Sequence, residues 1–183
     1  EAREGHGNLI TLTRYADKSI EVEDFGRGCP VDWNANEKRF NWELVFCELY
    51  AGGKYSNNEG ENYEYSLGLN GLGSCATQYA SEYMDVTVWR DGKKYELHFK
   101  KGKVVGKKGQ ELTISPADRK KTGTTIKWRP DLEVFTDIDI PEEFFKDVLH
   151  RQAVVNAGIT FRFRNQNGNK FEVTDYVYEN GIL

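Results

Sequence analysis

The sequence has few cysteines and no long apolar run, and each shortage excludes a class of protein. Its three cysteines, Cys29, Cys47 and Cys75, are odd in number and widely spaced, so they predict reduced thiols rather than a disulfide framework or a zinc site. No apolar stretch approaches the roughly 20 residues that a membrane-spanning helix needs, and residues 1–7 lack the apolar core of a secretory signal. We therefore expect a cytoplasmic protein with no membrane partner.

Methionine is also scarce, since Met84 is the only one and the chain starts at Glu1. A translated reading frame begins with methionine, so we expect the chain to be processed or cut from something longer. Its 183 residues, 38% of them hydrophobic, suffice for one domain with a real core. The net charge of −4 argues against a domain that itself grips a nucleic-acid backbone, although it does not exclude membership of a larger DNA-handling machine.

The hydrophobic pattern predicts helices that interrupt a mainly antiparallel sheet. The predicted helices cover residues 36–50, with Asn34 or Asn36 as the cap, 72–81, and Pro141 to about Asn156. The predicted strands form hairpins over 9–25, 84–99 with a turn at Asp91-Gly92, and 159–178, and two further strands cover 112–114 and 124–128. Residues 54–67 and the basic segment 100–108 are predicted loops. This order indicates an α+β fold, a two-layer α/β sandwich.

Asp24 is the first residue that this pattern does not explain. Alternation along Ile20, Val22 and Asp24 places the carboxylate on the apolar face. A buried carboxylate without a partner is unfavourable, so it must meet a donor. The donor is either local, in a salt bridge or a turn cap at the strand end, or it belongs to a ligand, such as an exocyclic amine. Thr124 shares a strand face with Ile126, so its hydroxyl also points inward and can meet such a carboxylate.

Two glycine-rich segments favour close approach of the backbone to a ligand. Gly26-Arg27-Gly28 follows Asp24 and suits either a flat ligand or an ordinary tight turn. The segment from Gly68 to Gly73 opens a predicted helix, which favours phosphate binding, with a flexible hinge as the alternative. It is neither a Walker A motif nor a strand-led Rossmann fingerprint. Lys54 is a candidate counter-charge for phosphate, or simply a solvated lysine.

Taken together and in this order, these motifs resemble the GHKL ATPases, in the branch of the bacterial type II topoisomerase B subunits. The residues that carry the resemblance are Glu1-Ala2, Gly5-His6, Val22 to Pro30, Leu49 to Tyr55, Gly68 to Gly73, Thr122 to Thr124, Trp128 to Pro130 and Asn156 to Ile159. They span nearly the whole chain, and Ala51-Gly52-Gly53-Lys54 favours this branch over a MutL-type repair ATPase. The resemblance implies one ATP-binding domain of the GHKL (Bergerat) type over residues 1–183.

The resemblance also implies a role for each residue of an ATP site. Asp24 would accept a hydrogen bond from the adenine amino group, with Thr124 and Gly28 holding a water beside it. Arg27 would lie over the adenine and pair with Glu1. The other implied contacts are the close-approach residue Gly26, the walls Pro30, Val45 and Ile126, the lid residue Tyr63, and the phosphate-binding residues Lys54, Leu69, Asn70, Gly71, Leu72 and Gly73. Such a slot prefers adenine over guanine, which carries an oxo group where adenine has the amine.

The cofactors and partners are likewise implied by the resemblance. ATP would be the ligand, but the family's Mg²⁺-binding asparagine and catalytic glutamate lie on the helix just before Glu1. We therefore expect no catalytic or metal-binding residue within 1–183, and nucleotide binding with little hydrolysis. The intact protein would dimerise and act with DNA and the gyrase A subunit, the isolated chain would be a monomer, and ATP-competitive inhibitors would occupy the adenine site. Gyrase, topoisomerase IV and a degenerate, non-catalytic domain all remain open.

Overall fold

The computed structural model describes residues 1–49 and 73–180 as one large sheet with helices packed on it. The helices are η1 (Ala2–Glu4), α1 (Asn41–Phe46), α2 (Gly73–Tyr79) and α3 (Glu142–Val155). The strands are β1 (Leu9–Arg14), β2 (Ile20–Asp24), β3 (Trp33–Asn34), β4 (Arg39–Phe40), β5 (Ser81–Arg90), β6 (Lys93–Lys100), β7 (Lys103–Val104), β8 (Thr113–Pro116), β9 (Gly123–Pro130), β10 (Thr160–Asn167) and β11 (Lys170–Tyr176).

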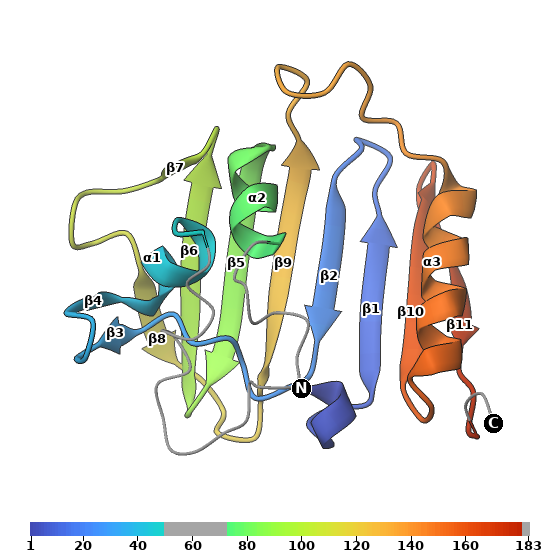
Figure 1. Ribbon diagram of the computed structural model, residues 1–183, viewed down its shortest axis with the longest axis horizontal. Coiled ribbons are helices and arrows are strands. Elements are labelled where there is room, and N and C mark those ends of the chain that lie inside the picture. Colours follow the sequence, from blue (N-terminus) through green and yellow to red (C-terminus); the bar gives the residue numbers. More distant parts are fainter. Residues whose placement is uncertain (50–72, 181–183) are drawn as a thin grey trace.

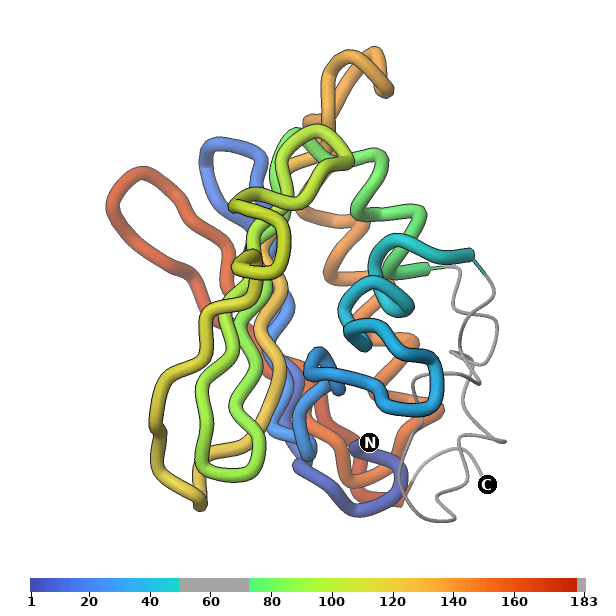
Figure 2. The backbone as a smooth tube through the Cα atoms, turned by 90° about the vertical axis from the view of Figure 1, so that its left-hand side faces the viewer, coloured from blue at the N-terminus to red at the C-terminus, as the bar shows by residue number. Residues whose placement is uncertain are grey.

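The large sheet has nine strands in the order β11-β10-β1-β2-β9-β5-β6-β7, and β8 pairs with β6 beside this path. Its described ladders are antiparallel except that of β1 with β10. The strands lie side by side in Figure 1, and the view along the sheet in Figure 2 shows α1, α2 and α3 together on one face. The predicted α+β fold, a two-layer sandwich with a mainly antiparallel sheet, is confirmed.

Most of the predicted elements are present with small shifts in their ends. The hairpin of β1 and β2 lies within residues 9–25, and α3 follows Pro141 as expected. Asp91 and Gly92 both have positive φ, at 54° and 74°, as a two-residue turn between twisted strands requires. The predicted helix over 72–81 corresponds to α2, although residue 72 lies outside the described part of the chain.

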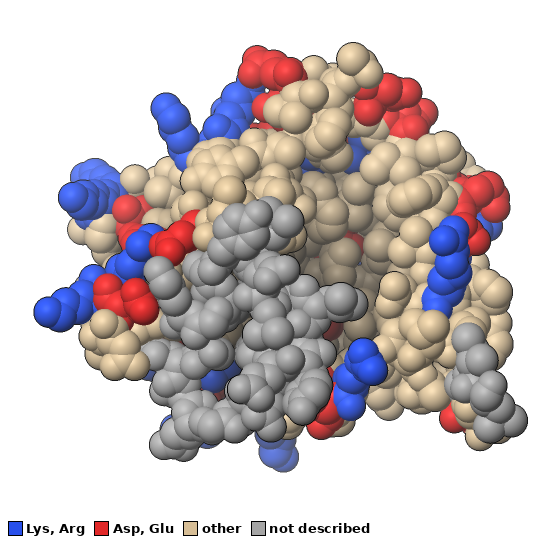
Figure 3. All heavy atoms as spheres, viewed as in Figure 1, with Lys and Arg blue, Asp and Glu red and all other residues tan. Residues whose placement is uncertain are grey.

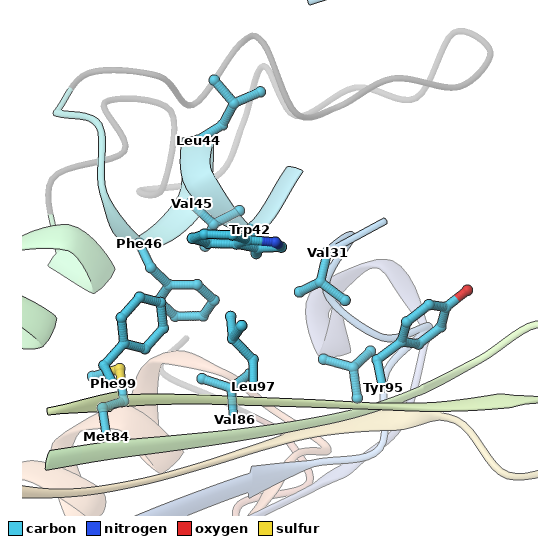
Figure 4. Packing of buried hydrophobic residues seen from close by; sticks show 11 residues of the cluster. Val31, Trp42, Leu44, Val45, Phe46, Met84, Val86, Tyr95, Leu97 and Phe99 are labelled. Carbon is cyan, nitrogen blue, oxygen red and sulfur yellow. The ribbon is translucent and has the colours of Figure 1, made fainter. Parts of the chain in front are cut away.

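Two apolar clusters hold the helices on the sheet. In the first, Trp42 and Phe46 of α1 pack against Phe99 of β6, with ring centroids 6.1 and 5.6 Å apart. Figure 4 shows these rings between α1 and the strands, above Val86 and Leu97. The second cluster lies under α3, where Phe145 stacks on Phe163 with ring centroids 6.0 Å apart. Burying each such side chain stabilises the fold by about 1.5–3 kcal/mol.

The predicted helix over residues 36–50 is wrong in extent. Within the described residues 36–49, only Asn41–Phe46 is helical, and β3 and β4 form a short hairpin before it. Asn34 does not cap a helix; its side chain accepts hydrogen bonds from the backbone of Asn36 and Glu37 in the hairpin turn. Lys38 then takes a φ of 55°, which a right-handed helix does not allow. The predicted end at Gly52-Gly53 lies outside the described residues.

The prediction that the basic segment 100–108 is a loop is wrong in part. Lys101 and Gly102 have φ values of 49° and 81° and make a tight turn. This turn brings Lys103 and Val104 back as β7 to pair with Lys100 and Phe99 of β6. This strand could not be recognised from the sequence pattern, because only two of its residues pair. The predicted loop over 54–67 lies outside the described residues.

Candidate functional site

Asp24 lies at the last position of β2, where three strands of the sheet meet. Its Cα partners are Ile10 on β1 and Thr124 on β9. The carboxylate Oδ1 accepts a hydrogen bond of 2.9 Å from the backbone N–H of Gly26. The local turn cap, one of the two alternatives for Asp24, is therefore present. An ionised carboxylate has about four acceptor positions, so this cap leaves capacity for a donor from a ligand.

The surroundings of Asp24 disfavour its charge. Burial raises the pKa of this carboxyl above its usual value, and the negative charge of Glu1 adds to the increase. Hydrogen bonds from the backbone of Gly26 and Thr124 act in the opposite direction without cancelling it. A half-buried carboxylate with a displaced pKa at the end of a strand is a candidate for a functional site. An additional donor placed against it would lower the free energy of the charged form.

Thr124 is buried, and its hydroxyl joins β9 to the turn that follows β2. Its Oγ1 accepts a hydrogen bond of 2.8 Å from the backbone N–H of Cys29. The predicted meeting of this hydroxyl with Asp24 is therefore consistent with the strand register. Burial raises the pKa of the Cys29 thiol to about 12. The thiol stays protonated at neutral pH, so Cys29 is an apolar wall and not a nucleophile.

Three glycines let the backbone come close around Asp24. A Cβ on Gly26 would lie 2.9 Å from Cβ of Glu1 and 3.2 Å from Oδ1 of Asp24. Gly28 has a φ of 93°, and a Cβ there would lie 2.6 Å from the carbonyl oxygen of Trp89. Gly123 has a φ of 141°, and its Cβ would lie only 2.2 Å from the carbonyl oxygen of Asp24. A side chain at Gly28 or Gly123 would displace the backbone of Trp89 or Asp24, and one at Gly26 would displace Glu1.

Arg27 is held by the predicted pair with Glu1. Its guanidinium donates two hydrogen bonds, from Nε at 3.0 Å and from Nη2 at 2.7 Å, to the two oxygens of Glu1. The Arg27 backbone N–H adds a third at 2.9 Å. Burial alone would raise the pKa of Glu1, but these hydrogen bonds and the positive charge of Arg27 outweigh it and lower the pKa to about 2. The bidentate pair fixes the plane of the guanidinium beside the glycine turn.

The apolar walls that were predicted for this site come from separate elements. Val45 of α1 is buried in the first cluster, and Ile126 of β9 packs against that cluster. Cys29 packs there as well, next to the half-buried Pro30. The structure thus pairs Asp24 of β2 with Thr124 of β9 and places Val45, Ile126 and Cys29 in one cluster, and their roles as adenine contacts stay a prediction. Figure 3 shows a hollow in the surface between the positions that α2 and α3 occupy in Figure 1.

Comparison with known proteins gives a consistent assignment, although no protein-family model matches the chain. The whole chain is 34% identical over 183 residues to the B subunit of DNA topoisomerase 4 from Salmonella typhimurium, of which it covers 28%. It is also 34% identical over 184 residues to the B subunit of DNA gyrase from Thermotoga maritima, of which it covers 27%. The chain therefore spans about a quarter of the length of these relatives.

Two solved structures share the fold. The topoisomerase IV ATP-binding domain of Francisella tularensis, in complex with a small-molecule inhibitor, matches with a TM-score of 0.78 and 28% identity, over 100% of this chain and 46% of that one. The 43K ATPase domain of Thermus thermophilus gyrase B, in complex with an aminocoumarin, matches with a TM-score of 0.78 and 27% identity. This match covers 99% of this chain and 43% of that one. The chain is a homologue of the ATP-binding domain of type II topoisomerase B subunits.

Six of the predicted contacts of this topoisomerase homologue lie outside the described residues. They are Lys54, Tyr63, Leu69, Asn70, Gly71 and Leu72. Gly73 is described and begins α2. The phosphate part of the site therefore stays a prediction, and the adenine contacts predicted for the described residues stay a prediction as well.

Arg90 is a neighbour of the site that sequence reasoning missed. Its guanidinium donates a hydrogen bond of 2.8 Å to the carbonyl oxygen of Gly28 and so supports the glycine turn from β5. The two residues are 62 positions apart, and no local pattern marks the contact. Only the strand order, which places the end of β5 beside this turn, reveals it.

The described part of the topoisomerase homologue offers neither a metal cluster nor a membrane span. Across residues 1–49 and 73–180, no group of three or more His, Cys, Asp or Glu side chains is placed to hold a metal ion. Within the same ranges, no helix has both the length and the apolar character required to cross a bilayer.

Replacing Glu1 by Gln is expected to lower the free energy of unfolding by about 1 kcal/mol at pH 7, because the pair with Arg27 is only partly exposed. The folded-state pKa of Glu1, about 2, lies below its ordinary value of 4.5. The contribution is therefore complete above about pH 4.5 and is lost as the pH falls through about 2. Urea unfolding of both chains at several pH values measures the difference. A difference that stays constant between pH 7 and pH 3 would contradict the assignment to this pair.

Proposed function

We propose that the chain is a single ATP-binding domain of a type II topoisomerase B subunit, and that the intact protein couples ATP binding and hydrolysis to DNA strand passage. The observation that carries the proposal is the half-buried Asp24 carboxylate, paired across the strands with Thr124 and framed by Gly26, Gly28 and Gly123. The relatives include both DNA gyrase and topoisomerase IV, each at the same 34% identity, so the proposal covers both enzymes.

Adenine recognition follows from groups that the chain itself supplies. Asp24 accepts a hydrogen bond from the exocyclic amine, and this donor offsets the cost of keeping a charged carboxylate half-buried. Val45 and Ile126 contact the two sides of the base, and the Arg27 guanidinium, fixed by Glu1, covers its outer face. Guanine would turn an oxo group towards Asp24, and two facing acceptors repel each other.

The phosphates and the metal belong to the same proposal. By homology, Lys54 and the backbone of Leu69 to Gly73 hold the phosphates. Mg²⁺, when bound with ATP, neutralises charge on the phosphoryl oxygens. Across the described residues, no group of three or more His, Cys, Asp or Glu side chains is placed to hold this ion.

The partners of the intact protein are also part of the proposal. We propose that it dimerises and acts on DNA together with a gyrase A-type subunit in the cytoplasm. ATP-competitive inhibitors would bind at Asp24, in line with the inhibitor complexes of the two similar structures.

The proposal predicts that the 183-residue chain binds ATP more tightly than GTP by about tenfold or more, because only ATP presents a donor to Asp24. Calorimetric titration with a non-hydrolysable analogue of each nucleotide measures both dissociation constants. Equal affinity for the two would contradict the role of Asp24 in base recognition. Binding of neither at millimolar concentration would favour a degenerate domain in which Asp24 only caps the turn at Gly26.

A further inference from the structure

A second surface of the molecule carries a concentration of positive charge that nucleotide binding does not use. Residues 100–108 contain five lysines and no acidic residue, in a chain with a net charge of −4. They form the end of β6, the short strand β7 and the segment after it, at one edge of the nine-stranded sheet. Figure 3 shows lysine and arginine side chains projecting from the side of the molecule where Figure 1 places β7.

The pairing of β6 with β7 places like charges against each other. Lys100 and Lys103 are direct partners in the ladder, so their side chains leave the same face of the sheet. This face is the one opposite the helices, since the neighbouring Phe99 of β6 is buried beneath α1. Like charges directly opposite in an antiparallel pair destabilise the pair. Across the ladder, Lys100 also adjoins Tyr83, which pairs in turn with Arg129 of β9.

The acidic residues of the described chain neutralise only one lysine of the segment. Lys101 donates to Glu133 at 2.9 Å. Lys100, Lys103, Lys107 and Lys108 are exposed, and none of them forms an ion pair with a residue in 1–49 or 73–180. These four lysines constitute the β7 lysine patch. Four ammonium groups on one edge, without an ion-pair partner among residues 1–49 and 73–180, produce a local positive field despite the negative net charge.

We propose that the β7 lysine patch binds the phosphate backbone of duplex DNA. The inference rests on the proposed function, because a topoisomerase works on DNA, and it adds the surface that DNA contacts. The polar side chains of the segment are all lysines, which bind phosphate oxygens as point charges, and contacts to phosphate carry no sequence information. It also has no aromatic residue on which an unpaired base would stack, which favours a duplex over a single strand.

This assignment refines the expectation drawn from net charge alone. A net charge of −4 excludes strong DNA binding by the surface as a whole. It does not exclude a local contact, because screening confines each charge to about 8–10 Å in physiological salt. We therefore expect weak binding by the isolated chain, which in an intact enzyme would position DNA that other parts hold.

The test is fluorescence anisotropy with a labelled 20-base-pair duplex in low salt, comparing two triple variants of the 183-residue chain. The test variant carries Lys103→Gln, Lys107→Gln and Lys108→Gln. The matched control carries Lys38→Gln, Lys120→Gln and Lys170→Gln, which are exposed lysines elsewhere with the same total change in charge. We expect the test variant to bind at least tenfold more weakly and the control to change less than threefold.

Salt dependence gives the second readout. Each lost phosphate contact should reduce the slope of log K against log salt by about 0.9, so the test variant should lose roughly 2–3 units of slope. If both variants bound the duplex equally weakly, the loss of affinity would depend on net charge alone, and this result would overturn the proposal. It would also be overturned if the unaltered chain failed to bind the duplex, or if a single strand of the same length competed better than the duplex.

The same chains separate this inference from the proposed function. Both triple variants should bind ATP as the unaltered chain does, because none of the altered lysines belongs to the adenine site. ATP binding together with unchanged DNA binding in the test variant would refute only the patch. DNA binding that depends on the patch, without any ATP binding, would refute only the nucleotide site.

Discussion

Replacing Asp24 by Asn is expected to weaken ATP binding about 5- to 150-fold. The amide would turn an N–H₂ group towards the adenine amine or lose its bond to Gly26, and breaking one buried polar pairing costs about 1–3 kcal/mol. Calorimetric titration with a non-hydrolysable ATP analogue measures the change. Asp85→Asn is the matched control, because it makes the same chemical change on the opposite face of the sheet, where Asp85 pairs with His98.

The same substitution should leave the fold at least as stable as before. Burial raises the folded-state pKa of Asp24, so the ionised carboxylate disfavours folding at neutral pH. This cost is fully present above the folded-state pKa and disappears as the pH falls to the ordinary value of 3.8. Asn removes the cost, so Asp24→Asn should unfold at the same or a higher temperature at pH 7, and this difference should vanish near pH 4.

These two measurements together distinguish a binding residue from a structural one. If the variant loses affinity for ATP but no stability, the carboxylate serves binding at a cost to the stability of the fold. If Asp24→Asn binds ATP as tightly as the unaltered chain, the carboxylate serves only as the turn cap on Gly26. If the variant instead unfolds easily, the cap contributes more to stability than the buried charge costs.

Replacing Gly123 by Ala is expected to lower the free energy of unfolding by about 2–5 kcal/mol. Its φ of 141° is strained for any residue with a Cβ, and that Cβ would lie 2.2 Å from the Asp24 carbonyl oxygen. Backbone strain of this kind costs about 1–3 kcal/mol, and overpacking adds a similar amount. The melting temperature should fall by roughly 5–20 °C in a thermal unfolding scan.

Gly109→Ala is the matched control for this prediction. Gly109 also has a positive φ, 84°, but a Cβ there would meet no atom within 4 Å. It should therefore show the backbone strain without the collision, at about 1–3 kcal/mol. Equal losses at the two positions would mean that the end of β9 can move away from Asp24. That result would also contradict a rigid frame for the carboxylate.

Some features of this protein could be predicted from residues close together in the chain. The alternation of Ile20, Val22 and Asp24 already placed the carboxylate inward, and the Asp91-Gly92 turn was evident from two residues. Both depend on the period of a strand and on the backbone freedom of glycine, which are local properties. The extent of the helix after residue 36 was not predictable in this way. Residues 33–40 form the β3-β4 hairpin instead, where the Asn34 side chain accepts hydrogen bonds from the backbone of Asn36 and Glu37 in place of helical hydrogen bonding.

By itself, then, the sequence determined the fold class, the inward carboxylate and its family resemblance. Only the tertiary structure decided what surrounds Asp24: the hydroxyl of Thr124, 100 positions away, the close approach of Gly123, and the support of Gly28 by Arg90. It also placed Lys100 and Lys103 face to face at the sheet edge. The physical reason is that local patterns set which way a side chain points. Strand order and register determine what it meets there, and both result from the packing of the whole sheet.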